Sequence, residues 1–306
     1  MNKDILLDKS RSDDIFIIIN NKSYSFIEFN ALVSRFIKMI EDSNLKIQRL
    51  GINCNSKLNI LVAVIACNRL NITPAIIPPK HKGLSNINYE KIASCDAIVN
   101  EFNCIIQLNG GELSESKSIE NNIQCILFTS GSKGAPKAVE LTFDNIFSSA
   151  LNWNKALRFK TNSRYLNILP LYHIGGLVIF FRSIYCNFVS VVCDYNKHNI
   201  LSEIIEKNID YISVVPKMLY DFINRKELNI VAKNIDTIVI GGDGINKYHY
   251  DELVKNNVNA YVSYGMTETS SGISGYFINQ IENFDPGFLG YAHNNVDITV
   301  ANNNIV

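Results

Sequence analysis

The sequence lacks the features that mark membrane, secreted and nucleic-acid-binding proteins. Its 29 Lys and Arg residues balance 29 Asp and Glu residues, and no basic block is present that would bind a phosphate backbone. The longest apolar run, 60–67, is far shorter than the roughly 20 residues that a membrane-spanning helix needs. The first 14 residues carry charges of both signs and no apolar signal core. We therefore expect a cytoplasmic protein with no membrane span and no nucleic-acid partner.

The cysteines and histidines do not follow a pattern of disulfides or metal ligands. The seven cysteines are odd in number and widely spaced, none belongs to a CxxC pair, and several lie in apolar runs. The five histidines are unclustered. This pattern is typical of reduced, buried thiols and does not indicate a structural metal site.

Short apolar runs alternate with segments of helical period along most of the chain, and this alternation predicts an α/β fold with mostly parallel sheets flanked by helices. The expected strands are 15–19, 75–77, 97–99, 123–128, 165–169, 188–193, 211–214, 237–240 and 260–263. The expected helices are 26–40, 57–70, 143–157, 175–184, 199–207, 217–225 and 247–256. Ser25 and Glu28 have the spacing of a capping box for the first of these helices.

A loop rich in glycine, hydroxyl groups and lysine follows the expected strand 123–128 directly. Residues 129–137 read TSGSKGAPK. Glycine lets backbone N–H groups approach phosphate oxygens, hydroxyl groups donate hydrogen bonds, and lysine neutralises charge, so the loop is suited to a polyphosphate. A Walker loop would continue from its second glycine into a helix, whereas Gly134 is followed by Ala135 and Pro136 and the next helix is expected near Phe143. A flexible loop without function is the alternative.

Three further motifs lie near the ends of expected strands. Residues 241–244 read GGDG and close the strand 237–240, and residues 264–269 read YGMTET and follow the run 260–262. A carboxylate suits a hard cation such as Mg²⁺, and an aromatic face suits a purine. His173 lies in the run 170–177, PLYHIGGL, where a histidine near a helix start is the alternative to a pocket residue.

In this order and spacing, the motifs resemble those of the adenylate-forming superfamily, which comprises acyl-CoA synthetases, adenylation domains of peptide synthetases, and luciferases. Two positions of the loop differ from its usual pattern, because Lys133 stands where threonine is usual and Ala138 replaces a final glycine. The resemblance covers nearly the whole chain. It implies that ATP and Mg²⁺ activate a carboxylic acid to an acyl-adenylate, with CoA as the co-substrate.

The resemblance also implies a role for each matching residue. The implied nucleotide-binding residues are Thr129, Ser130, Gly131, Ser132, Lys133, Gly134, Gly241, Gly242, Asp243, Gly244, Tyr264, Gly265, Met266 and Thr267. The implied catalytic residues are Lys137, His173, Thr267 and Glu268, of which Glu268 is also the Mg²⁺ ligand. The implied acid-binding residues are His173, Gly175, Gly176 and Arg182.

Within the superfamily, residues 169–185, 212–219 and 264–271 are most similar to the o-succinylbenzoate–CoA ligases of menaquinone synthesis. Arg182 matches a basic position that we associate there with the second carboxylate of the substrate. It lies nine residues after His173, a spacing at which two residues of one helix lie on roughly the same side. A basic residue that binds an acidic acyl group would be sensible chemistry, and a surface arginine is the alternative.

The implied architecture is a large adenylate-forming N-terminal domain. We expect a first α/β subdomain over 1–108, a second one with the nucleotide loops over 123–271, and the start of a small β subdomain, including 296–300, over 272–306. The polar stretch 109–122 is either a boundary or a surface loop.

Superfamily members continue beyond the position of Val306 into a mobile C-terminal domain that carries a catalytic lysine. We expect that domain to be absent here, adenylation to be slow or absent, and CoA transfer to be weaker still. The partners are then a carboxylic acid, ATP and CoA, with a carrier protein or a separate C-terminal domain as further candidates. Two alternatives remain open at this point: an adenylation domain that loads a carrier protein or an amine, and a degenerate short form that binds nucleotide without catalysis.

Overall fold

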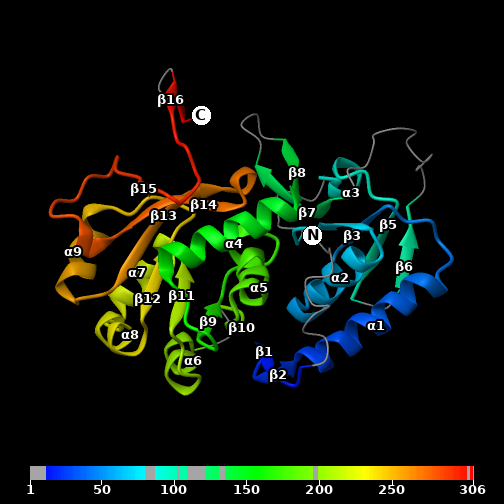
Figure 1. Cartoon of the computed structure of the whole chain (residues 1–306), viewed down its shortest axis with the longest axis horizontal. Coiled ribbons are helices and arrows are strands. Elements are labelled where there is room, and N and C mark those ends of the chain that lie inside the picture. Colours follow the sequence, from blue (N-terminus) through cyan, green and yellow to red (C-terminus); the bar gives the residue numbers. More distant parts are fainter. Residues whose placement is uncertain are drawn as a thin grey trace. The chain divides into compact units, whose positions relative to one another are not determined.

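The structure is a computed structural model, and it describes residues 12–79, 87–101, 104–108, 122–130, 135–195, 199–301 and 304–305. The chain forms two compact units (Figure 1). Unit 1 comprises Met1–Ile146 and Leu171–Leu177, and unit 2 comprises Phe147–Pro170 and Val178–Val306.

Unit 1 contains a sheet with the strand order β6-β5-β3-β4-β7-β8. Strands β3, β4, β5 and β7 run parallel, while β6 and β8 are antiparallel at the two edges. Strands β1 and β2 form an antiparallel pair that precedes these strands in the chain. The strands of unit 1 are β1 Ile15–Ile19, β2 Lys22–Ser25, β3 Arg49–Ile52, β4 Thr73–Ile76, β5 Ala97–Asn100, β6 Cys104–Gln107, β7 Ile123–Ser130 and β8 Pro136–Thr142.

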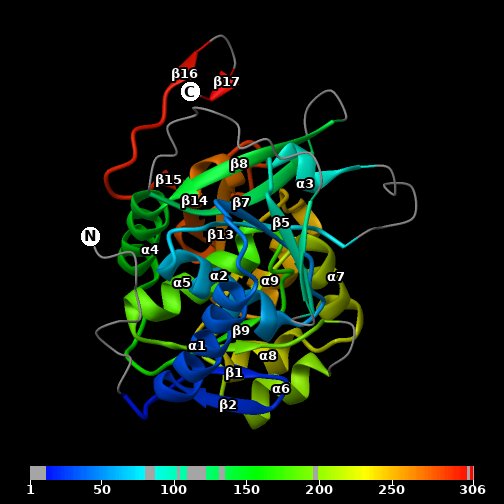
Figure 2. The same ribbon diagram turned by 90° about the vertical axis from the view of Figure 1, so that its right-hand side faces the viewer.

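Helices α1 (Phe26–Asp42) and α2 (Lys57–Arg69) of unit 1 pack against each other (Figure 2). The expected capping box starts α1: the Glu28 amide donates to Ser25 Oγ at 3.2 Å, and the Ser25 amide donates to Glu28 Oε2 at 2.9 Å. Helix α2 is buried without interruption from Ile60 to Asn68, as a helix between other layers should be. The short helix α3 covers Tyr89–Ile92.

Unit 2 is built on strands in the order β15-β14-β13-β12-β11-β9-β10. The run from β10 to β13 is parallel, and β14 and β15 return antiparallel. These strands are β9 Arg164–Asn167, β10 Val189–Val192, β11 Tyr211–Val214, β12 Thr237–Ile240, β13 Ala260–Met266, β14 Ser271–Phe277 and β15 Tyr291–Ala292, and the pair β16 Val300–Ala301 and β17 Asn304–Ile305 stands apart.

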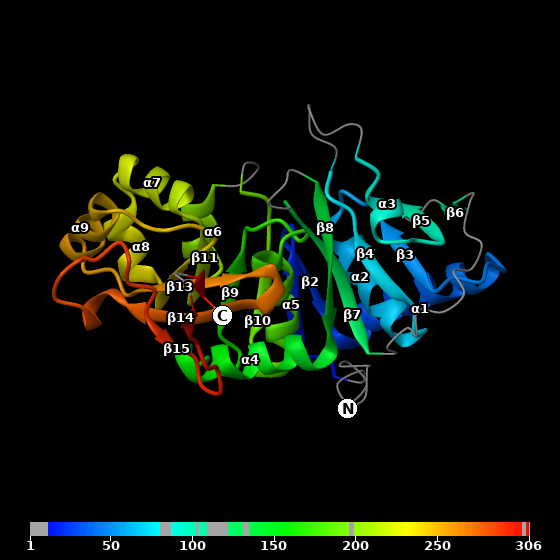
Figure 3. The same cartoon turned by 90° about the horizontal axis from the view of Figure 1, so that it is seen from above.

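Helices cover both faces of the unit 2 sheet. Figure 3 shows α7, α8 and α9 on one face and α4 on the other. The helices are α4 Phe143–Leu157, α5 Ile174–Cys186, α6 Ile200–Glu206, α7 Pro216–Asn224, α8 Leu228–Asn234 and α9 Lys247–Lys255; α4 and α5 begin in unit 1. Within the described ranges, each helix falls short of the length and hydropathy that crossing a bilayer would require.

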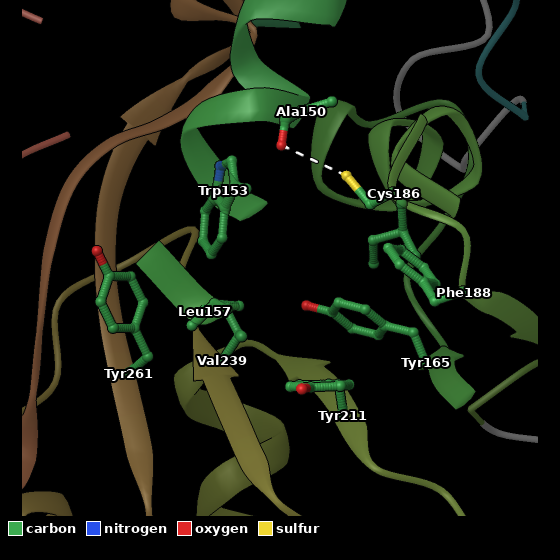
Figure 4. Packing of buried hydrophobic residues seen from close by; sticks show 10 residues of the cluster. Ala150, Trp153, Leu157, Tyr165, Cys186, Phe188, Tyr211, Val239 and Tyr261 are labelled. Atoms are coloured by element: carbon green, nitrogen blue, oxygen red, sulfur yellow. Dashed lines mark hydrogen bonds between the residues drawn. The ribbon is translucent and has the colours of Figure 1, made fainter. Parts of the chain in front are cut away.

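Aromatic side chains dominate one part of the unit 2 core (Figure 4). Trp153 of α4 and Tyr261 of β13 meet edge to face with ring centroids 5.7 Å apart. Tyr165 of β9 is fully buried, and its hydroxyl lies 2.7 Å from Ser213 Oγ of β11, which satisfies a polar group that burial would otherwise leave unbonded. This packing fixes α4 against the strands that carry the loops described below.

The α/β class with mostly parallel sheets is confirmed, as are the nine strands expected from apolar runs, although several bounds shift by a few residues. Residues 296–299 form no strand, and the β structure expected near there starts at Val300, with β16. Strand β13 continues through Met266, three residues beyond its expected end, because β14 returns beside it and supplies hydrogen bonds. Residues 109–121 of the polar stretch lie outside the described residues, and the three-part subdomain division stays a prediction.

Candidate active site

The lysine-containing loop connects two antiparallel strands of unit 1. Thr129 near the end of β7 pairs with Lys137 near the start of β8, and Ser130 pairs with Pro136. The Lys137 side chain is exposed. Residues Gly131, Ser132, Lys133 and Gly134 lie outside the described residues. Because a strand follows the loop where a Walker loop would have a helix, the exclusion of that class is confirmed.

Helix α4 begins directly after β8, at the position expected from the sequence. The Thr142 amide donates to Asn145 Oδ1 at 2.9 Å, and the Asn145 amide donates to Thr142 Oγ1 at 3.2 Å. These reciprocal bonds satisfy backbone donors at the helix start and fix the exit of β8.

The GGDG segment forms a turn at the carboxyl end of β12 in unit 2. Gly242 has φ +82°, a conformation that residues with a side chain rarely adopt. The Gly244 amide donates to Asp243 Oδ1 at 2.8 Å, which holds the aspartate side chain against its own turn. A Cβ added at Gly244 would meet no atom within 4 Å, so this part of the turn borders open space.

The YGMTET segment forms the tip of a tight hairpin between β13 and β14. Thr267 and Glu268 lie in a short 3-10 turn, η2 (Thr267–Thr269), and the Glu268 side chain is exposed. The Thr269 hydroxyl accepts from the Met266 amide at 3.0 Å and lies 2.8 Å from the Ser271 carbonyl, so it braces the turn.

Two contacts hold this hairpin tip in place. A Cβ at Gly265 would come 2.1 Å from the Ser271 carbonyl oxygen, so only glycine allows β13 and β14 to approach this closely. Ser149 Oγ of α4 donates to the Ser270 carbonyl at 2.7 Å. The tip therefore presents Thr267 and Glu268 from a backbone that is fixed on both sides.

The glycine turn, β13 and residues 284–289 enclose a cavity of about 350 Å³ in unit 2. Its lining residues are Gly242, Asp243, Gly244, Ile245, Val262, Ser263, Tyr264, Gly265, Tyr276, Phe284, Asp285, Pro286, Phe288 and Leu289. Five of the predicted nucleotide-binding residues are thus brought together around one space, and three more, Gly241, Met266 and Thr267, flank them in sequence.

The polar side chains of this cavity include two carboxylates, which are hydrogen-bond acceptors. Asp285 Oδ1 accepts from the Gly287 amide at 2.8 Å, as Asp243 does from Gly244. Neither carboxylate forms an ion pair with another described residue. The cavity therefore combines aromatic walls with carboxylate oxygens that can accept from the amino group of a ligand.

His173 precedes α5 and belongs to unit 1. Its carbonyl accepts from the amides of Gly176 and Leu177, each at 3.1 Å, so His173 holds the cap position of the helix. The side chain is exposed, and partial desolvation by neighbouring atoms lowers its pKa. It is therefore neutral at pH 7 and able to accept or donate a hydrogen bond. Gly175 and Gly176 form the first turn of the helix.

Arg182 of α5 is buried in unit 2, with 2% of its surface exposed, so the alternative of a surface arginine is wrong. Its Nη2 donates to Ser271 Oγ at 2.8 Å, and its guanidinium carbon lies 4.2 Å from the ring centroid of Trp153. Burial lowers the pKa of the guanidinium to about 10, which still leaves it charged at neutral pH.

A preformed metal cage is not found among the described residues, which contain no group of three or more His, Cys, Asp or Glu side chains placed to share an ion. Mg²⁺ commonly binds with nucleotides through one or two carboxylates and the phosphates themselves. Glu268, exposed at the hairpin tip, fits that mode.

Sequence reasoning missed Phe284 and Asp285, which form part of the far wall of the cavity. The segment has no regular secondary structure and no periodicity to mark it. The available signal was the glycine pair 287 and 290: Gly290 has φ +85°, and a Cβ there would lie 2.3 Å from the Gly275 backbone of β14.

Comparisons with known proteins agree with this geometry. A 2-succinylbenzoate–CoA ligase of Staphylococcus epidermidis (strain ATCC 35984) is 26% identical over 310 residues, which cover 97% of this chain and 64% of that protein. Two structures of o-succinylbenzoate CoA synthetase from Bacillus subtilis share the fold at 22% identity. One, a double mutant bound with its product analogue OSB-NCoA, gives a TM-score of 0.85 over 99% of this chain and 67% of that one. The other, in complex with ATP and magnesium ion, gives 0.80 over 99% and 68%.

This chain spans just under two thirds of the length of the Staphylococcus relative. Residues 96–305 match the family model described as AMP-binding enzyme. The chain therefore belongs to the family of AMP-binding enzymes.

Proposed function

We propose that this chain binds ATP and a carboxylic acid and joins them as an acyl-adenylate, as part of an AMP-forming acid–CoA ligase. The observation that carries the proposal is the unit 2 cavity beside the hairpin tip with Thr267 and Glu268, in a chain of the AMP-binding family. The same cavity and tip contain eight of the twenty residues that the sequence motifs single out.

The cavity is suited to a nucleoside. Its volume lies within the roughly 300–1,000 Å³ range of small-molecule pockets. Tyr264 offers an aromatic face for a base, and the carboxylates of Asp243 and Asp285 offer acceptors for an exocyclic amino group. Adenine carries such an amino group at the position where guanine carries an oxygen, so these acceptors favour adenine.

The hairpin tip is suited to the phosphates. We assign the Thr267 hydroxyl to the α-phosphate and the Glu268 carboxylate to Mg²⁺. For Lys137 we keep the role that the sequence resemblance implies, neutralisation of phosphate charge. Mg²⁺ bound there would draw electron density from the phosphate oxygens. The Bacillus subtilis relative in complex with ATP and magnesium ion supports this assignment.

Two group transfers follow from these assignments. In the first, a carboxylate oxygen of the acid attacks the α-phosphorus, and the bond from that phosphorus to the bridging oxygen breaks, which releases pyrophosphate. In the second, the sulfur of CoA attacks the acyl carbonyl, its proton passes to solvent, and the bond to AMP breaks. Positioning and charge neutralisation supply most of the rate enhancement in such steps.

We assign an acid-binding role to Arg182 of unit 2 and, from the sequence resemblance, to His173, Gly175 and Gly176 of unit 1. A buried cation is suited to a carboxylate that does not react, which points to an aromatic or dicarboxylic acid such as o-succinylbenzoate. The Staphylococcus relative named 2-succinylbenzoate–CoA ligase supports this substrate class. We further propose a cytoplasmic location, the expected three-part subdomain division, and a C-terminal domain as the partner that completes CoA transfer.

Acid-dependent release of pyrophosphate from MgATP tests the proposal. Expected is release with o-succinylbenzoate above a panel of short fatty acids, benzoates and amino acids. Glu268→Ala should lower the rate at least about 100-fold, as loss of a transition-state charge contact does. Glu206→Ala, which removes an exposed carboxylate from α6, is the matched control and should not change the rate. Equal rates in the two variants would refute the role of Glu268. Release with amino acids alone would refute the assignment of o-succinylbenzoate as the substrate.

A further inference from the structure

Arg182 is a buried cation whose anionic partner is not found among the described residues. Its Nη2 is bonded to the neutral Ser271 hydroxyl, and its Nε is buried with no acceptor. None of the ion pairs between described residues includes it. Burying a charge without a counter-charge is costly, so such a group persists where something else stabilises it or where it awaits a ligand.

Trp153 is the group that stabilises this charge. The guanidinium carbon lies 4.2 Å from the indole centroid, a cation–π contact in a desolvated place. The indole is itself held in position: Tyr261 and His293 meet it edge to face at 5.7 and 5.3 Å, and a Cβ at Gly272 would lie 2.6 Å from Trp153 Cζ2. Figure 4 shows Trp153 and Tyr261 facing each other at the edge of the aromatic cluster.

The titratable groups around this pair are uncharged at neutral pH. Burial and the charge of Arg182 lower the pKa of His293 to about 4. Burial raises the pKa of Tyr261 to about 12 and raises that of Tyr165 as well. Arg182 is therefore the charge that an approaching anion would meet, and none of these three groups competes for it.

The bonded hydroxyl also links this cation to the hairpin tip. Ser271, which accepts from Arg182, follows Glu268 by three residues and stands at the start of β14. The turn between them is braced by Thr269 and anchored to α4 through Ser149, and α4 also carries Trp153. The position of the guanidinium is thus fixed relative to Thr267 and Glu268 of the same unit.

We propose that Trp153 is a positioning residue for the acid substrate, because its indole face holds Arg182 with donors free to bind the carboxylate that does not react. This inference rests on the proposed function. The planar guanidinium forms paired hydrogen bonds with a carboxylate only when its plane is fixed, and the indole together with Ser271 fixes it. Trp153 acts through Arg182 and does not itself touch the acid.

Two acids separate this role from a merely structural one. The first is o-succinylbenzoate, and the second is benzoylpropionate, which lacks the ring carboxylate. Trp153→Leu should raise KM for o-succinylbenzoate about 10-fold, the size of a desolvated cation–π contact, and leave KM for benzoylpropionate and for ATP unchanged. Trp153→Phe, which keeps an aromatic face, should fall between Trp153→Leu and the unchanged protein. Equal changes for both acids would overturn the proposal.

A second measurement does not depend on turnover. The chain has one tryptophan, so its emission reports on the ring beneath Arg182 alone. Titration with o-succinylbenzoate should change that emission, and Arg182→Gln should abolish the change. Arg158→Gln, which removes an exposed arginine just after α4, is the matched control and should leave the change intact.

The two sets of results distinguish the proposals. Two outcomes would overturn the positioning role and leave the proposed function standing. In the first, pyrophosphate is released and the emission change survives Arg182→Gln. In the second, pyrophosphate is released and Trp153→Leu discriminates between the two acids as the unchanged protein does. If no acid on the panel gave pyrophosphate release and none changed the emission, the proposed function itself would be contradicted.

Discussion

Replacement of His293 by glutamine is expected to remove a large part of the acid sensitivity of the fold. His293 is 6% exposed, its Nε2 lies 2.8 Å from the Tyr261 hydroxyl, and its ring packs against Trp153. Burial, followed by the charge of Arg182, lowers its pKa from 6.5 to about 4. The unfolded chain therefore binds a proton at mildly acidic pH that the folded protein does not.

The size and sign of the effect follow from this difference. Since the unfolded state binds more protons below its own pKa, the free energy of unfolding falls as the pH drops from 6.5 towards 4. At about pH 5 the loss from this one residue is about 2 kcal/mol, and it approaches about 3 kcal/mol at lower pH. Above about pH 7.5 the residue contributes almost nothing to the pH dependence.

Urea denaturation at about pH 7.5 and about pH 5 measures the effect directly. The unchanged protein should lose about 2 kcal/mol more between the two pH values than His293→Gln does. His173 and His249, whose pKa values are also lowered by desolvation, are present in both proteins, so their contributions cancel. Equal losses in the two proteins would refute the reasoning, because His293 would then titrate near its ordinary pKa in the folded state.

The remaining predictions concern the hairpin tip. Gly265→Ala should lower the free energy of unfolding by at least about 2 kcal/mol, because its Cβ would lie 2.1 Å from the Ser271 carbonyl. Gly244→Ala, whose Cβ meets nothing within 4 Å, is its control and should stay within about 0.5 kcal/mol. Ser149→Ala leaves the buried Ser270 carbonyl without its donor and should cost about 1–2 kcal/mol. Thermal or urea denaturation checks all three, and an unaffected Gly265→Ala would contradict the close approach of β13 and β14.

The fold class was predictable because the parallel strands are short, apolar and buried. Strands such as β11 and β12 are buried at every position, so their sequences alone mark them. Strand β14 reads SGISGYF, with small residues where β13 comes close, and nothing in that composition predicts a strand until its partner is known. Strand β8 was not predicted either, because it lies at the edge of its sheet and carries the charged residues Lys137 and Glu140.

The site was predictable where chemistry is concentrated in a short motif. The GGDG segment follows β12, and the YGMTET segment begins at the end of the neighbouring parallel strand β13, so both lie where the carboxyl ends of these strands meet. The burial of Arg182 was not predictable, since it depends on how helix α5 packs against Trp153 of helix α4, which local periodicity does not show. The cavity positions of Phe284 and Asp285 could not be predicted either, because they depend on where an irregular segment folds back.

Calorimetric titration with AMP tests the central claim most directly, because it asks whether the unit 2 cavity holds an adenine nucleotide without requiring turnover. The account predicts saturable binding that Tyr264→Ala weakens by about 10-fold or more, the expected loss for an aromatic face that stacks on a base. Tyr248→Ala, which removes an exposed tyrosine from α9, should leave the affinity unchanged. Absence of binding at millimolar AMP, or an equal loss in both variants, would contradict the assignment of this cavity.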